Sequence, residues 1–164
     1  MALKTDIRGM VWKYPDPFVV GREQIRQYAK SIKAHDPAST DVEAAVARVR
    51  QTYARWGRGT TPAQMRADWD DLFSGMAINA AIQPATLGGV PGEWVTAPGA
   101  HDGGVLLYLH GGGFQIGSPR SHRELMAALS AAAGCRVFGL DYRLAPEHRP
   151  PAALDDALAA WSAL

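Results

Sequence analysis

The chain has 164 residues, of which 47% are hydrophobic and 20% charged, and its formal net charge is +1. This is the composition of a globular protein, and so small a charge excludes a strong general attraction to nucleic acid or to an anionic membrane. The single cysteine, Cys135, excludes an internal disulfide and a multi-cysteine metal site. We expect a cytoplasmic protein, because no apolar run approaches the ~20 residues of a membrane span and the N-terminus has no secretory pattern.

The N-terminal part of the chain is predicted to be helical. Residues 21–35 carry apolar side chains at helical spacing, and the segment DPAST at 36–40 interrupts that pattern. Residues 42–56 again place apolar side chains on one face, with arginines on the other, and Asp41 is suited to cap this helix. We therefore expect two amphipathic helices separated at 36–40.

A further helix is predicted to begin after Thr61. Thr61 is suited to be its N-cap, Pro62 takes the first helical position, and Gln64 would reach back to complete a capping box. Its apolar face would consist of Trp69, Leu72, Phe73 and Met76.

Beyond residue 80 the pattern changes to strands alternating with helices. Residues 82–98 contain two short extended runs around a glycine-rich turn, which predicts a hairpin. The apolar runs 105–109 and 137–141 predict two adjacent parallel strands buried on both faces, joined by a helix over 121–133. This order predicts an open α/β sheet, in which ligands bind beyond the carboxyl ends of the strands.

The last predicted helix begins at the prolines 150–151. It carries Asp155 and Asp156 in its early turns, where the helix dipole favours negative charge, and we interpret both as simple helix-start charges.

The most informative motif is HGGG at 110–113, directly after the apolar run 105–109. Glycines allow a loop to press its backbone N–H groups against a substrate, which suits the stabilisation of a developing oxyanion. A nucleotide phosphate loop is the weaker interpretation, since neither GxGxxG nor GxxxxGK[ST] occurs. The motif therefore indicates half of a catalytic site.

Together with DYRLAPEHRPPAALDDALAAW at 141–161, the segment HGGGFQIGS resembles the hormone-sensitive lipase family of α/β-hydrolase esterases. The resemblance covers about residues 41–164. It implies an α/β fold: the N-terminal part of an α/β-hydrolase parallel sheet, incomplete, with a helical cap region at 41–80 and a partial core at 81–164. It also implies a small acyl-ester substrate and no cofactor or metal.

The same resemblance implies roles for individual residues. Gly111 and Gly112 would donate their N–H groups to the oxyanion, with His110 and Gly113 supporting the loop. Three residues would brace that loop from the end of the second strand: Asp141, Tyr142 and Arg143. Apart from the resemblance, neither His122 nor His148 has a carboxylate or ligand partner at a recognisable spacing, so both are expected to be surface histidines beside loops.

The nucleophile that this site needs is absent from the sequence. In this fold the serine lies in G-x-S-x-G, and the acid and histidine follow it. None of the seven serines has glycines two positions before and after it. We therefore expect the chain to be inactive alone, since an oxyanion loop without a nucleophile cannot form an acyl-enzyme. We also expect an open strand edge at 105–109 to favour self-association.

Residues 1–39 resemble a different family, the start of actinobacterial (3R)-hydroxyacyl-ACP dehydratase subunits of the MaoC-like hot-dog fold. This resemblance rests on MALKTDIRGMVWKYPDPFVVGREQIRQYAKSIKAHDPAS and implies a dehydratase-like segment at 1–40. Two function classes follow: an ester hydrolase by ancestry, or a non-catalytic interaction module or fused dehydratase-like fragment.

Overall fold

The computed structural model describes residues 42–74 and 77–164. The chain divides into two units, residues 1–40 and 41–164, and the description below concerns the second unit. The expectations for residues 1–41, among them the Asp41 cap and the dehydratase-like segment, and for Met76 lie outside the described residues.

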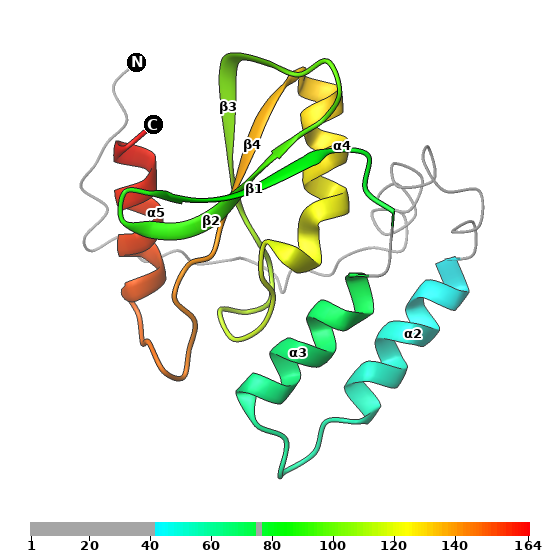
Figure 1. The fold of residues 1–164 in the computed structure, drawn as a ribbon. Helices are drawn as coiled ribbons and strands as arrows, with labels where there is room; N and C mark the ends of the chain where they lie inside the picture. Colours follow the sequence, from blue (N-terminus) through cyan, green and yellow to red (C-terminus); the bar gives the residue numbers. More distant parts are fainter. Residues whose placement is uncertain (1–41, 75–76) are drawn as a thin grey trace, which may run out of the picture. The chain divides into compact units, whose positions relative to one another are not determined.

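Two helices precede the sheet (Figure 1): α2 spans Val42–Ala54 and α3 spans Pro62–Phe73. α3 begins as predicted, because the Thr61 hydroxyl accepts a hydrogen bond from the backbone N–H of Gln64. The capping box is not completed, since the Gln64 side chain donates to Asp68 instead.

Aromatic side chains hold α2 and α3 together. The Trp69 ring centroid lies 5.8 Å from that of Tyr53 and 6.4 Å from that of Trp56, and Phe73 packs against Trp69 at 5.1 Å. The Trp56 indole, just beyond the end of α2, also donates to Asp68 of α3 at 3.0 Å. No residue of α3 is fully buried, so its predicted apolar face is only partly covered.

Four strands form one mixed sheet in the order β1-β2-β4-β3. β1 (Ala81–Leu87) and β2 (Val90–Thr96) form the predicted hairpin, which turns at Gly88 and Gly89. β2 pairs antiparallel with β4 (Cys135–Leu140), and β4 pairs parallel with β3 (His101–Leu109). The two adjacent parallel strands are therefore confirmed, although they are the only parallel pair in the described sheet, and β3 begins before the apolar run.

Helices α4 (Arg123–Ala133) and α5 (Ala152–Ser162) cover opposite faces of this sheet (Figure 1). Successive residues of β4 alternate between the two faces, so that Val137 packs with Met126 of α4 and Phe138 packs with Ala160 of α5. α4 ends at Gly134, as predicted, with a left-handed φ of +65°. No helix among residues 42–74 and 77–164 is long and apolar enough to cross a membrane.

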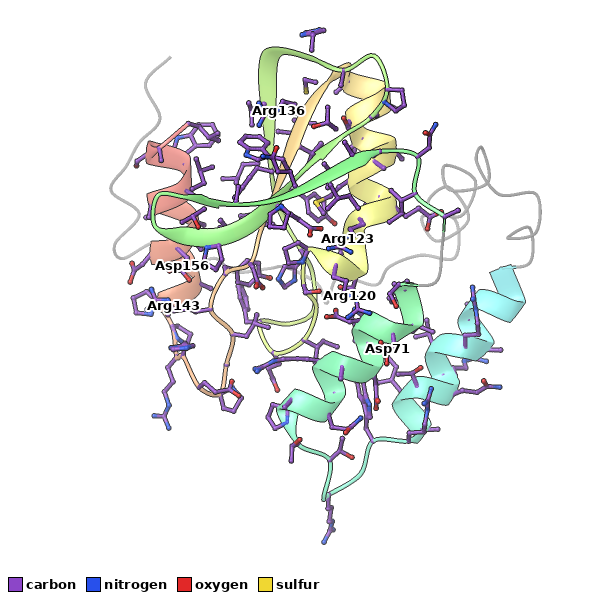
Figure 2. All side chains as sticks on the ribbon, in the orientation of Figure 1. Asp71, Arg120, Arg123, Arg136, Arg143 and Asp156 are labelled. Atoms are coloured by element: carbon purple, nitrogen blue, oxygen red, sulfur yellow. The ribbon has the colours of Figure 1, made fainter. Side chains whose placement is uncertain are left out.

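A short 3-10 helix, η2 (Arg120–His122), precedes α4 and lies against α3. Figure 2 shows Arg120 of η2 facing Asp71 of α3, with 3.6 Å between guanidinium and carboxylate. The helical segment 42–74 therefore contacts the loop that follows β3.

β3 is an edge strand of the described sheet, because only β4 pairs with it there. Val105, Leu106 and Leu109 are 40%, 38% and 49% exposed. The expectation of a strand buried on both faces is therefore wrong for β3, whereas β4 is buried as predicted. The difference is that β4 has a neighbour on each side.

Candidate active site

The HGGG segment forms a tight loop at the carboxyl end of β3. Gly112 and Gly113 have φ values of +127° and +62°, which side chains rarely allow. A Cβ atom at Gly112 would lie 1.9 Å from the carbonyl oxygen of Ile116, and one at Gly117 would lie 2.7 Å from the His110 ring. The loop takes this shape because glycine stands at each of these positions.

The peptide groups of the loop have defined directions. The Gly111 carbonyl lies 2.8 Å from His110 Nδ1, and the Gly112 carbonyl accepts from the N–H groups of Gln115 and Ile116, each at 3.1 Å. A trans peptide points its C=O and the following N–H in opposite directions. The N–H groups of Gly112 and Gly113 therefore face away from these partners, and they donate to none of the described residues.

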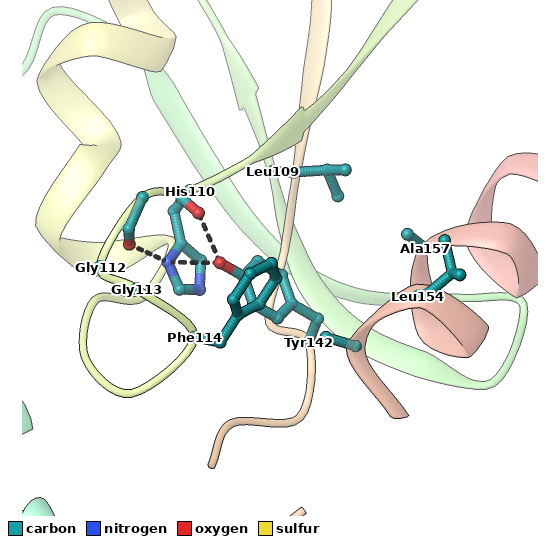
Figure 3. A pocket seen from close by; sticks show the side chains of 10 residues that line it. Leu109, His110, Gly112, Gly113, Phe114, Tyr142, Leu154 and Ala157 are labelled. Atoms are coloured by element: carbon teal, nitrogen blue, oxygen red, sulfur yellow. Dashed lines mark hydrogen bonds between the residues drawn. The ribbon is translucent and has the colours of Figure 1, made fainter. Parts of the chain in front are cut away.

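His110 is the buried support of the loop, with only 4% of its surface exposed. Its ring stacks on that of Tyr142, with 4.3 Å between centroids, and the Tyr142 hydroxyl donates to the His110 carbonyl (Figure 3). Because the Gly111 carbonyl can only accept, Nδ1 carries the proton and Nε2 is an acceptor without a partner among the described residues. Burial lowers the pKa of His110, which favours the neutral ring.

His122 is half-buried, so the expectation of a surface histidine is wrong. Its ring lies 5.6 Å from that of His110, and its Nδ1 lies 3.1 Å from the Ser118 carbonyl. Burial lowers the pKa of His122 as well. The neighbouring Ser118 hydroxyl donates to Asp70 of α3 at 2.6 Å. No spacing in the sequence indicated this polar cluster, because Asp70 lies far from the loop along the chain.

The three residues expected to brace the loop lie in different places. Tyr142 contacts His110, as described above. The Asp141 N–H donates to the Pro91 carbonyl of β2 at 2.9 Å, and desolvation, followed by the charges of nearby carboxylates, raises the pKa of Asp141. Arg143 points to α5 (Figure 2), where its Nη2 lies 2.7 Å from Asp156 Oδ1 and its backbone N–H donates to Asp156 Oδ2.

Asp156 is therefore an anchor of α5 and not a simple helix-start charge. Its side chain is 7% exposed, and the hydrogen bonds from Arg143 hold the pKa of Asp156 below its usual range. Sequence reasoning missed this pair, although both residues lie in the segment that carries the family resemblance.

The loop, the end of β3 and α5 line a pocket of about 380 Å³ (Figure 3). Most of the side chains around it are apolar. The lining residues are Leu109, His110, Gly111, Gly112, Gly113, Phe114, Tyr142, Ala153, Leu154 and Ala157. Within the described part of the chain, no three His, Cys, Asp or Glu residues are grouped to hold a metal ion.

This fold has counterparts among known proteins. Residues 106–164 match the α/β-hydrolase fold family. An acetyl-hydrolase of Streptomyces hygroscopicus is 52% identical over 89 residues, which cover 52% of this chain and 29% of that protein. The crystal structure of an esterase from the bacterial hormone-sensitive lipase family matches with a TM-score of 0.68 and 41% identity, over 73% of this chain and 40% of that one.

This part of the chain has the α/β-hydrolase fold and is similar in sequence and structure to esterases of the hormone-sensitive lipase type. This hydrolase-type unit, residues 41–164, carries the mixed sheet and the glycine loop described above. The chain spans only 29% of the acetyl-hydrolase and 40% of the esterase.

A second kind of relative matches a shorter stretch. A UPF0336 protein of Mycolicibacterium paratuberculosis is 67% identical over 45 residues, which are 27% of each protein. This match agrees with the second resemblance in the sequence, which is to a family other than the hydrolases.

Proposed function

We propose that the hydrolase-type unit is the oxyanion-binding part of an ester hydrolase, and that the 164 residues alone do not hydrolyse esters. The observation that carries this proposal is the direction of the loop peptides. Gly112 and Gly113 present N–H groups that have no partner among the described residues, beside an apolar pocket. Such donors stabilise the charge that develops on an ester carbonyl oxygen under attack.

The peptide directions extend the expected pair, Gly111 and Gly112, to Gly113. The His110 carbonyl accepts from Tyr142, so the Gly111 N–H likewise faces away from its peptide's partner and donates to none of the described residues. The Gly111 carbonyl faces the His110 ring, which turns the Gly112 N–H outward. His110 and Tyr142 then act on the loop and not on the substrate. The pocket suits a small uncharged acyl group, and an acetyl-hydrolase among the relatives supports a short one.

The expected inactivity follows from the missing nucleophile. No serine of the chain stands in G-x-S-x-G, and the Ser118 hydroxyl is engaged by Asp70. Purified chain should hydrolyse p-nitrophenyl acetate and p-nitrophenyl butyrate no faster than buffer does, and a fluorophosphonate probe should label no serine. A burst of p-nitrophenol or a covalent serine adduct would overturn this part of the proposal.

The oxyanion role is tested by supplying the missing chemistry. The chain should be co-expressed with the segment of a hormone-sensitive lipase family esterase that carries G-x-S-x-G, and the complex should hydrolyse p-nitrophenyl acetate while neither part does so alone. Gly112→Ala should abolish this activity. Gly59→Ala, at a turn where an added Cβ meets nothing within 4 Å, should retain it. A stable complex without activity contradicts the oxyanion role.

The open edge of β3 favours a second function, the binding of another copy of this chain. The segment 103–109, GGVLLYL, has no charge, and its apolar side chains are exposed on an edge without a paired strand in the described sheet. Proteins normally protect such edges with charges or cover. Two identical edges pair antiparallel about a two-fold axis, which closes the assembly as a dimer. Leu154 extends the apolar surface across the pocket.

Sedimentation velocity tests this association. We expect a dimer, and we expect Leu106→Lys to convert it to a monomer, because two lysines would then meet at the shared edge. Thr86→Lys is the matched control on β1, the opposite edge of the described sheet, and should leave the dimer intact. A monomeric wild-type chain, or equal effects of the two lysines, contradicts pairing through β3.

A further inference from the structure

Arg66 of α3 contacts two loops that border the candidate site. Its Nε donates to the Gln115 carbonyl and its Nη2 to the Ala145 carbonyl, each at 2.8 Å. The same guanidinium forms a two-pronged ion pair with Glu147, whose closest contact is 2.7 Å. Arginine suits this position because its planar group offers several donors in fixed directions.

The peptides that Arg66 contacts are those that orient the glycine loop. In the peptide between Gln115 and Ile116, the carbonyl accepts a hydrogen bond from Arg66 and the N–H donates to the Gly112 carbonyl. In the peptide between Phe114 and Gln115, the carbonyl accepts from the Ala145 N–H at 2.7 Å. The N–H of this peptide donates to the same Gly112 carbonyl. Both peptides are therefore held from outside and converge on Gly112.

The Gly112 carbonyl belongs to the peptide that carries the Gly113 N–H. Holding this carbonyl keeps that N–H on the opposite side of the peptide, away from Gln115 and Ile116. Arg66 acts on one converging peptide directly and on the other through Ala145, whose carbonyl it also binds. A second link from α3, between Asp70 and Ser118, lies just beyond the loop.

We propose that Arg66 is a positioning residue for the oxyanion loop, and that α3 supports the loop from outside in addition to any role as a cap. The role of the loop in binding an oxyanion rests on the proposed function, whereas the effect of Arg66 on the loop's conformation can be measured without ester hydrolysis. Loss of Arg66 should free the peptides at 114–116 and let the Gly112–Gly113 peptide rotate, while the sheet stays folded.

Amide hydrogen exchange and ¹⁵N relaxation measured by NMR on the full chain test the proposal. In Arg66→Gln, we expect the Gln115 and Ile116 amides to exchange about tenfold faster, as expected for the loss of a charge-assisted hydrogen bond, and the Gly113 amide to gain motion. The Val137 amide of β4 should not change. Arg66→Lys should show nearly the same faster amide exchange as Arg66→Gln, because one ammonium cannot bind both carbonyls in the same geometry.

Two further variants complete the test. Arg58→Gln, at an exposed arginine on the turn between α2 and α3, is the control and should match wild type. Glu147→Gln removes only the partner that orients the guanidinium, and it should accelerate exchange of the same amides by a smaller factor. This variant keeps the proposal testable if Arg66→Gln does not fold. Wild-type exchange at Ile116 in Arg66→Gln, or equal acceleration at Val137, would overturn the proposal. Absence of ester hydrolysis would leave these signals unaffected.

Discussion

At Gly112 the backbone has a φ of +127°, and a side chain would meet the carbonyl oxygen of Ile116. Gly113 has a φ of +62° but open space where its Cβ would be, whereas Gly111 has neither restriction. The three glycines of one motif therefore differ in how strongly the loop requires them, although the sequence shows them as equivalent.

This difference predicts a graded response to alanine. Gly112→Ala should lower the free energy of unfolding by at least about 2 kcal/mol, because it combines left-handed strain with a steric clash. Gly113→Ala should cost about 1 kcal/mol from strain alone, and Gly111→Ala should be close to neutral. Urea denaturation of the three variants gives the order. A Gly112→Ala variant as stable as Gly111→Ala would contradict the loop geometry.

Among the elements, α5 is joined to the residues after β4 by the carboxylate of Asp156, in addition to its apolar packing on Phe138. Asp156 accepts from both the backbone and the guanidinium of Arg143, and α5 in turn lines the candidate pocket through Leu154 and Ala157. The neighbouring Asp155 is exposed. Two adjacent aspartates on one helix thus have different environments.

We expect Asp156→Asn to lower the melting temperature by about 5 °C, since a neutral amide replaces the carboxylate that receives these bonds. Asp155→Asn is the matched control and should shift it by less than about 2 °C. Thermal unfolding followed by circular dichroism measures both. Equal shifts for the two variants would show that the contact with Arg143 does not anchor α5.

At the scale of the whole molecule, one buried and one half-buried histidine, His110 and His122, make stability depend on pH. Burial lowers the folded-state pKa of both His110 and His122 below the ordinary value of 6.5. Below pH 6.5 the unfolded chain therefore binds protons that the folded chain does not. The contribution of these residues is complete above pH 6.5 and is lost as the pH falls from 6.5 through the lowered pKa values. Asp141, whose pKa is raised, acts in the opposite direction.

We therefore expect the free energy of unfolding in urea to be lower at pH 5.5 than at pH 7.5. His122→Gln should reduce this difference, because one of the two histidines no longer takes up a proton on unfolding. His148→Gln, at an exposed position on the loop before α5, should leave it unchanged. Stability that rises on acidification over this range would contradict the burial of both rings.

The sequence by itself determined the elements and the place of the glycine motif. The Thr61 cap, the Gly134 stop, the hairpin and the two parallel strands follow from local spacing and local backbone preferences, which act over a few residues. The HGGG motif also indicated its own place at a strand end, because strand and loop are continuous in the chain.

Only the tertiary structure decided what surrounds that motif. The contacts of Arg66 with Gln115 and of Asp70 with Ser118 join residues far apart in the chain, and no periodic pattern records such pairs. The directions of the loop peptides depend on which carbonyls find donors after folding. The exposure of β3 likewise depends on its place at the edge of the described sheet. The comparable apolar run of β4 is buried, because β4 has a strand on each side.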